Sequence, residues 1–551
     1  MNAKELRELG ENLYGKKQPI NSLWQDTADN FYYERANFTL QRSIGMDFAA
    51  NTMTSYPAMC RRDLGNSLGA MLRPTTKVWF HTGIRHEQIK DNETRQWLQG
   101  FEETQRRAMY DPHAKFTRAT KEGDHDFAAF GQCAISIELN KDANGLLYRC
   151  WHLRDMVWQE NEEGDIGARF RRWKPTAQTL VRTFGEAKLN GDIVKNAKTA
   201  PFEETELMHI VVEADMFDGN AKGRPFWSIW YDVAHETMID ASPIWTGYYV
   251  IPRWQTVSGS QYSYSPATVC ALPDARLIQA MTFTLLEAGE KATSPPMIAT
   301  IDAVRSDLAL YAGGVVWVDP EYDERMGDAL RPITQDFRGF NFGTQMNQEA
   351  RAMIRQAFFL DQITMPQRDA ERVTAFEVNQ RVETYLRQAT PIFEPMEQEY
   401  NARLCDDTFE LMWRNGAFGS PLDWPKTLRG ADIGFNFESP LHDAVEQQKG
   451  QLLLQGSQLL ATAQAIDPTV AYIVDGPAAY RDALDGIGWP GKWMRNEDDV
   501  QQIVQEKQSQ QQAQQLLASI QQGASAAKDL GAANASNVGA QQPQPAQQGA
   551  Q

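Results

Sequence analysis

The stretch LPDARLIQAMTFTLLEAGEKATSPP (residues 272–296) predicts one long helix. Asp274 can cap its N-terminus, and apolar residues recur every three or four positions through 275–292. Pro295 and Pro296 then prevent the helix from continuing. A helix over 275–292 would be about 27 Å long, because each helical residue adds roughly 1.5 Å.

A second helix is predicted over 343–360. Short strand patterns, MIATI and GGVVWV, lie in the span 297–335 between the two helices. The two helices therefore bracket a small β-containing module. The second helix carries its apolar side chains on one face, namely Met346, Ala350, Met353, Ile354, Ala357 and Phe358.

The span DQITMPQRDAERV (361–373) has no periodicity and predicts a loop that joins two long helices. Thr374 and Glu377 form a capping box that starts the next helix, which Pro391 and Pro395 should kink or break. The loop holds Arg368 and Arg372 among acidic residues. Mixed charge of this kind is most often solvated surface, yet loops also carry function disproportionately, so both interpretations stay open.

The remaining chain divides into a helical start and end around a β-rich section. Residues 1–130 have helical spacing, whereas 131–252 hold short alternating runs such as GQCAISIEL and LMHIVVEA. Beyond Gly430 a helical block is expected, with Ser439 as an N-cap. The Gln-rich segment 501–522 suits a coiled coil or barrel helix, or a linker. The last thirty or so residues have a composition that predicts disorder in the free chain.

Composition bounds the function of these 551 residues. A hydrophobic fraction of 42% and a charged fraction of 23% are those of a folded protein of several domains. The net charge of −18 disfavours tight, sequence-independent DNA binding, but it permits DNA to pass a wall that repels it. The five cysteines form no CxxC pair, and no apolar stretch predicts a signal peptide or a membrane span, so a cytoplasmic chain is expected.

Two short motifs could suggest chemistry, and neither has the context that it needs. GENLYGKK (10–17) nearly matches a phosphate-binding loop, but Lys17 replaces the hydroxyl that would hold Mg²⁺ and no buried strand precedes it. The EGDHD run (122–126) could suggest a metal, but a solvated charge cluster is the simpler interpretation. We therefore predict no catalytic residue, no cofactor and no metal.

Several segments resemble the portal proteins of short-tailed bacteriophages. GSQYSYSPATVCALPDARLIQAM (259–281) is similar to the family's YGxSP…LPDxxxL segment, except that Ser263 stands where the family usually has Gly. PPMIAT (295–300) resembles its double proline, and RVTAFEVNQR (372–381) its RVTAxEVxxR segment. NSLGAMLRPTTKVWF (66–80) resembles the helix that ends in a proline before Trp-Phe. Together these matches run from about residue 40 to about residue 415.

The resemblance implies an α+β portal-type fold, mainly helical, with smaller β-containing parts in the wing and clip. The parts it implies are a wing (1–274), a stem helix (275–292), a clip (293–342), a second stem helix (343–360), a tunnel loop (361–373), a kinked wing helix (374–436), a helical crown (437–522) and a tail (523–551). Gln367, Arg368 and Arg372 would face DNA in the tunnel. Stem packing in the ring would involve Met353, Ile354, Ala357 and Phe358, which a single hairpin cannot cover.

The same resemblance implies the partners. Twelve copies would form a ring at one capsid vertex in the virion, after assembly in the host cytoplasm. Double-stranded DNA would pass through it during packaging and ejection. The terminase large subunit, then tail adaptor and nozzle proteins, would dock on it, and the major capsid and scaffolding proteins would surround it, with no membrane involved.

Two other classes compete with this interpretation. A packaging ATPase would share the DNA but needs a phosphate loop. A head or tail structural protein without a channel would predict more β repeats and no long pair of helices. The pair of helices favours the portal interpretation.

Overall fold

The computed structural model describes residues 1–41, 45–47, 52–75, 78–85, 92–299, 325, 330–332, 338–363, 396–437 and 456–460, with scattered residues between 479 and 514. The chain divides into two compact units. The smaller comprises 86–98, 425–428 and 449–551, and within it the hydroxyls of Thr94 and Thr427 lie 2.6 Å apart. Everything described below belongs to the larger unit unless stated otherwise.

The predicted helical start is confirmed. The helices are α1 (Ala3–Lys16), α2 (Gln18–Phe31), α3 (Tyr56–Leu72), α4 (Asn92–Met109, whose first residues belong to the smaller unit) and α5 (Phe116–Phe130), with the 3-10 turn η1 (Tyr33–Arg35) after α2. A capping box starts α1, in which Asn2 and Glu5 each accept a hydrogen bond from the other's backbone N–H. One strand within this span, β1 (Phe80–Ile84), was not predicted.

The β-rich section is also confirmed, as two antiparallel sheets. One has three strands in the order β3-β2-β9, and the other is a five-stranded meander, β4-β5-β6-β7-β8. Helices α6 (Ala177–Phe184) and α7 (Gly191–Thr199), with η3 (Glu186–Lys188) between them, are inserted between β5 and β6. The strands are β2 (Ile135–Leu139), β3 (Leu146–Cys150), β4 (Met156–Glu160, after the 3-10 turn η2, Leu153–Asp155), β5 (Ile166–Trp173), β6 (Leu207–Glu213), β7 (Phe226–Asp232), β8 (Thr237–Ile244) and β9 (Tyr249–Val250).

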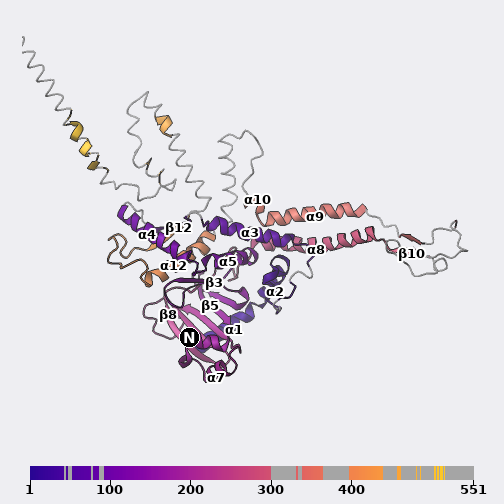
Figure 1. Ribbon diagram of the computed structural model, residues 1–551, viewed down its shortest axis with the longest axis horizontal. Helices are drawn as coiled ribbons and strands as arrows, with labels where there is room; N and C mark the ends of the chain where they lie inside the picture. Colours follow the sequence, from indigo (N-terminus) through magenta and orange to yellow (C-terminus); the bar gives the residue numbers. More distant parts are fainter. Residues whose placement is uncertain are drawn as a thin grey trace, which may run out of the picture. The chain divides into compact units, whose positions relative to one another are not determined.

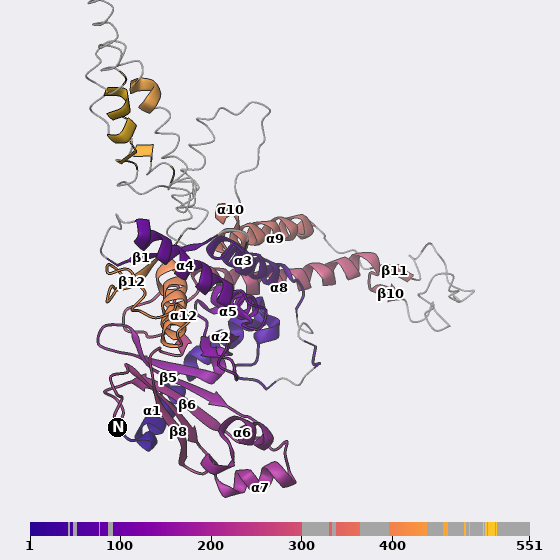
Figure 2. The ribbon, with the colours of Figure 1, turned by 60° about the vertical axis from the view of Figure 1, so that its left-hand side comes forward.

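Helix α1 lies against one face of the five-stranded sheet (Figure 2). Its Leu6, Leu13 and Tyr14 pack with Phe170 of β5 and with apolar residues of β6 and β7. Gly10 allows this approach, because a Cβ there would lie 2.9 Å from the ring of Phe170. The GENLYGKK segment is therefore the end of a packed helix and not a phosphate-binding loop.

The long helix is present, but its start was predicted wrongly. Helix α8 runs over Pro266–Thr293, and its N-cap is Ser265, not Asp274. Pro273 lies inside this helix and does not end it. The helix has 28 residues and is therefore about 42 Å long. The second helix, α9 (Arg338–Ala357), begins and ends earlier than predicted and is followed by α10 (Leu360–Ile363), which includes the first residues of the predicted loop. Strand β10 (Met297–Ala299) pairs with β11 (Leu330–Pro332).

After residue 395 the chain continues as a π-helical turn, η5 (Glu397–Ala402), and α12 (Arg403–Arg414). Strand β12 (Ile433–Phe437) pairs with β1 and was not predicted; it ends before Ser439, where the helical block expected beyond Gly430 would start. The capping box at Thr374, the prolines at 391 and 395, the cap at Ser439, most of the predicted clip and crown, and the tail lie outside the described residues.

Candidate functional site

The most distinctive feature of the larger unit is the hairpin of α8 and α9, which lie side by side and extend away from the sheets (Figure 1). Gly343 of α9 lets the helices approach, because a Cβ there would lie 3.0 Å from Leu285 of α8. The amide of Asn347 donates to the hydroxyl of Thr282 at 3.2 Å. Figure 2 shows β10 and β11 at the far end of this hairpin.

Burial is concentrated at the root of the hairpin, although Asn347 and Ala350 of α9 are also buried where the two helices meet. On α8 the buried positions end at Ile278, although the helix continues for fifteen more residues. On the returning side Ile354 and Phe358 are fully buried, and the ring of Phe358 lies 5.3 Å from that of Phe31. The amide of Gln279 accepts hydrogen bonds from the backbone of Met53 and Thr54. The root is therefore fixed to the N-terminal helices.

The burial corrects part of the predicted stem packing. Ile354 and Phe358 are covered within one chain, so they need no second subunit. Ala357 is half-buried, whereas Met353 is 49% exposed. Other large apolar side chains of the hairpin are exposed too. We call them, with Met353, the exposed hairpin set: Leu277, Phe283, Leu286, Phe342 and Met353.

An exposed set of this kind makes the hairpin a candidate binding surface, because contiguous apolar patches on soluble proteins often mark interaction sites. Helix α8 is also, among the described helices, the one whose length and composition would allow it to cross a membrane. Core helices of soluble proteins meet the same criterion, and the root of α8 is buried in protein.

The EGDHD run is not a solvated cluster, so that interpretation was wrong. Asp124 and Asp126 are buried, and each forms an ion pair with an arginine from elsewhere in the chain, Arg73 and Arg35 respectively. Burial raises the pKa of both carboxyl groups, and the arginines oppose that rise. His125 contacts Arg61 at 3.0 Å, and burial together with Arg61 lowers its pKa to about 4.

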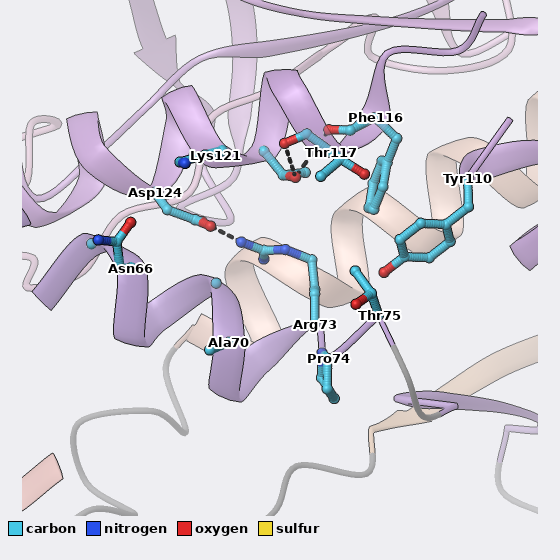
Figure 3. Close-up of a pocket in the computed structure, with 13 residues that line it drawn as sticks. Asn66, Ala70, Arg73, Pro74, Thr75, Tyr110, Phe116, Thr117, Lys121 and Asp124 are labelled. Carbon is cyan, nitrogen blue, oxygen red and sulfur yellow. Dashed lines mark hydrogen bonds and ion pairs between the residues drawn. The ribbon is translucent and has the colours of Figure 1, made fainter. Parts of the chain in front are cut away.

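These acids therefore face arginines. Among the described residues, no group of three or more His, Cys, Asp and Glu could hold a metal ion. Figure 3 shows the Arg73–Asp124 pair in the wall of a 420 Å³ pocket between the end of α3 and α5. These two charges neutralise one another, and the other charged residue that lines the pocket is the exposed Lys121.

Arg73 also holds the π-helical turn η5. Its Nη1 donates to Asn401 at 2.8 Å, and its guanidinium lies 4.4 Å from the centre of the Tyr400 ring. A second buried arginine, Arg253, donates from its backbone N–H and its Nε to Glu399 at 2.9 and 3.2 Å. The chain is thus anchored firmly at the turn that follows the span 364–395.

Gln367, Arg368 and Arg372 lie outside the described residues, so their expected place at DNA stays a prediction. Sequence reasoning missed Arg73 and Arg253 as anchors of η5. Each is a single arginine without a local motif. The partners of Arg73, for example, lie 51 and 328 residues away in the sequence.

The chain is similar to known phage proteins over nearly its whole length. The model of the family described as "Bacteriophage head to tail connecting protein" matches residues 3–494. The probable portal protein of Bordetella phage BPP-1 is 22% identical over 535 residues, which cover 94% of this chain and 93% of that protein. The portal protein of Salmonella phage epsilon15 is 22% identical over 545 residues, which cover 95% and 94%.

A solved structure, the virion of a native gene transfer agent particle, contains a chain that matches 80% of this chain and 95% of its own length. The identity is 9% and the TM-score is 0.33, and so distant a likeness carries no argument.

Proposed function

Because the chain belongs to the family of bacteriophage head to tail connecting proteins, we propose that it is a portal subunit whose copies form a ring around a DNA channel. Two relatives that carry the name portal protein match more than nine-tenths of both lengths. The structural observation that supports ring formation is the exposed hairpin set, whose side chains are 41–66% exposed against the described part of one chain. A ring of twelve at one capsid vertex of the virion is the form that we propose.

In this proposal α8 and α9 are the stem helices, with the bounds 266–293 and 338–357. The N-terminal helices and the two sheets form the wing, β10 and β11 belong to the clip, and 361–373 form the tunnel loop. The π-helical turn η5 then fixes the chain where it returns to the wing, through Arg73 and Arg253.

The charge of the chain suits a conduit. Twelve copies at −18 each would carry roughly two hundred excess negative charges, which keep a polyanion from adhering to the wall. Gln367, Arg368 and Arg372 would supply weak, transient contacts at the loop. The terminase large subunit would dock at the clip during packaging, and tail adaptor and nozzle proteins would dock there afterwards, with the major capsid and scaffolding proteins around the ring.

The competing class, a packaging ATPase, is disfavoured by the position of Lys17. A phosphate-binding lysine must reach the nucleotide, whereas the Lys17 side chain is buried between the carbonyl oxygens of Leu153 and Met156. A capsid or tail protein without a channel would not need a long apolar hairpin.

Electron microscopy of the purified full chain tests the proposal directly. Top views should show rings with a central hole, and added nucleotide should not be hydrolysed. Monodisperse monomers that turn over ATP would contradict it.

A further inference from the structure

A second cavity of 270 Å³ lies between the five-stranded sheet and α12. It is lined by Arg169 of β5, Glu213 of β6 and Phe226 of β7, and by Glu399 of η5 and Arg403 and Asp407 of α12. The turn between β4 and β5, which includes the exposed Asp165, also lines it.

Most charged groups of this cavity already have partners. Arg253 bonds with Glu160, Glu399 and the carbonyl oxygen of Gly164, so all its nitrogens are used. Arg403 forms an ion pair with Asp165, and Glu213 accepts from the amide of Asn161 at 2.9 Å.

Arg169 and Asp407 are the exceptions, since neither forms a hydrogen bond or ion pair within the described part of the chain, and Arg169 is the donor of the two. Its Nε and Nη1 atoms are buried, and no acceptor in the described part of the chain reaches them. Its guanidinium lies 5.3 Å from the centre of the Phe226 ring. Gly247 stands against it so closely that a Cβ there would lie 2.8 Å from the guanidinium carbon, so the group has little room to retreat on that side.

A buried guanidinium with unused donors is costly, and an acceptor in the cavity would remove that cost. Burial lowers the pKa of Arg169 to about 10, even though Asp407, Glu213 and Asp165 act in the opposite direction. Nearby carboxylates thus act on its charge through space, but its buried Nε and Nη1 donors keep no acceptor among the described residues.

We propose that this cavity binds a small oxyanion of the sulfate or phosphate type, with Arg169 as its principal donor. Guanidinium groups recognise such oxyanions through several charge-assisted hydrogen bonds at once. The site is independent of the proposed portal function and could operate in a single chain.

Asp407 controls the affinity of this site, because its ionised carboxylate would repel the anion. Burial raises the pKa of Asp407 to about 6, while Arg169 and Arg403 lower it and Asp406 and Glu410 raise it. Below this pKa the carboxyl group is neutral and the repulsion disappears. Anion binding should therefore strengthen as the pH falls through the pKa of Asp407.

Titration calorimetry of the full chain with sodium sulfate tests the site, against sodium chloride of equal ionic strength. The titrations are run one pH unit above and one pH unit below the pKa of Asp407. Sulfate keeps the same charge at both values, so any change in its affinity comes from titration of the protein. Arg169→Met should weaken binding by at least about tenfold, since charged hydrogen bonds are lost. Asp407→Asn should bind more tightly at the higher pH and lose the pH dependence.

Arg118→Gln is the matched control, because Arg118 is 77% exposed and its one ion pair among the described residues is with Glu122 of its own helix. It should bind sulfate like the wild type. Arg169→Met should also fold, since it removes a buried charge that lacks acceptors. Equal sulfate affinity in the wild type and in Arg169→Met would show that the cavity binds no anion. An unchanged pH dependence in Asp407→Asn would overturn the control that we assign to Asp407.

Discussion

The ammonium group of Lys17 donates a hydrogen bond to the carbonyl oxygen of Leu153 at 2.5 Å, inside the protein core. A second bond of 2.5 Å goes to Met156, and the indole ring of Trp24 lies 4.8 Å away. The side chain thus joins the α1–α2 junction to the start of β4. Burial lowers the pKa of Lys17 to about 7, while Asp155 raises it.

This pKa predicts how stability depends on pH. The unfolded chain keeps the proton of Lys17 up to about pH 10.4, whereas the folded chain releases it near neutrality. The free energy of unfolding should therefore rise with pH between these values, and the contribution of Lys17 should be lost as the pH falls through 7. Between pH 7 and 9 this contribution is about 2 kcal/mol.

Urea denaturation of the wild type and of Lys17→Met at pH 7 and at pH 9 measures the contribution of Lys17 to the free energy of unfolding. All other titrating groups cancel in the comparison, so the stability of Lys17→Met should rise less with pH. Parallel pH profiles of the two proteins would contradict the assignment.

The Arg73–Asp124 pair predicts a large loss of stability when one partner is removed. Arg73→Met leaves the Asp124 carboxylate buried without its cation, which should cost about 3–5 kcal/mol of unfolding free energy. The double variant with Asp124→Leu should recover part of this loss, because no isolated charge remains. Arg118→Gln, at an exposed pair, should change stability by less than about 1 kcal/mol. Additive losses in the double variant would contradict the coupling.

The sequence predicted the parts of the fold that depend on local patterns. The N-terminal helices, the β-rich section and the α8–α9 pair all follow from residue spacing and turn residues. The pairing of β1 with β12 could not be predicted, because Phe80 and Phe437 are register partners separated by most of the chain. A strand of five residues carries too little periodicity to show a distant partner.

The errors have local physical reasons. Pro273 reads as a helix breaker, yet α8 continues through it. Val269, whose carbonyl loses its helical donor at Pro273, has a 51% exposed side chain, so water can reach this side of the helix. The acids of EGDHD look like surface residues because their partners, Arg35 and Arg73, are distant in the sequence.

The exposed hairpin set predicts a variant that folds but does not assemble. Phe283→Asp with Leu286→Asp places two charges on side chains that are 53% and 55% exposed in one chain, so the fold should survive. If neighbouring copies cover these side chains, the charges would be buried there without partners and rings should not form. Size-exclusion chromatography and negative-stain images measure the outcome.

Ile354→Asp is unsuitable for this test, because Ile354 is buried within the chain and the charge would unfold it. The matched control is Met238→Asp on β8, where the side chain is 48% exposed and lies on a strand outside the hairpin. Rings of wild-type size in the double variant would show that these hairpin side chains do not lie in the subunit interface.

The arginines of 361–373 predict a phenotype that is separate from assembly. If Arg368 and Arg372 touch the phosphates of passing DNA, Arg368→Glu with Arg372→Glu should leave rings intact while impairing packaging or retention of the genome. Phage particles that carry the variant would be scored for DNA content. The control, Arg182→Glu with Lys195→Glu, makes the same change in formal charge at exposed positions of α6 and α7. Because a general charge effect would appear equally in both pairs, only a loss of DNA confined to the loop variant supports the contact. Failure of the loop variant to form rings, with no specific effect on DNA, would instead make this loop a structural element of the subunit.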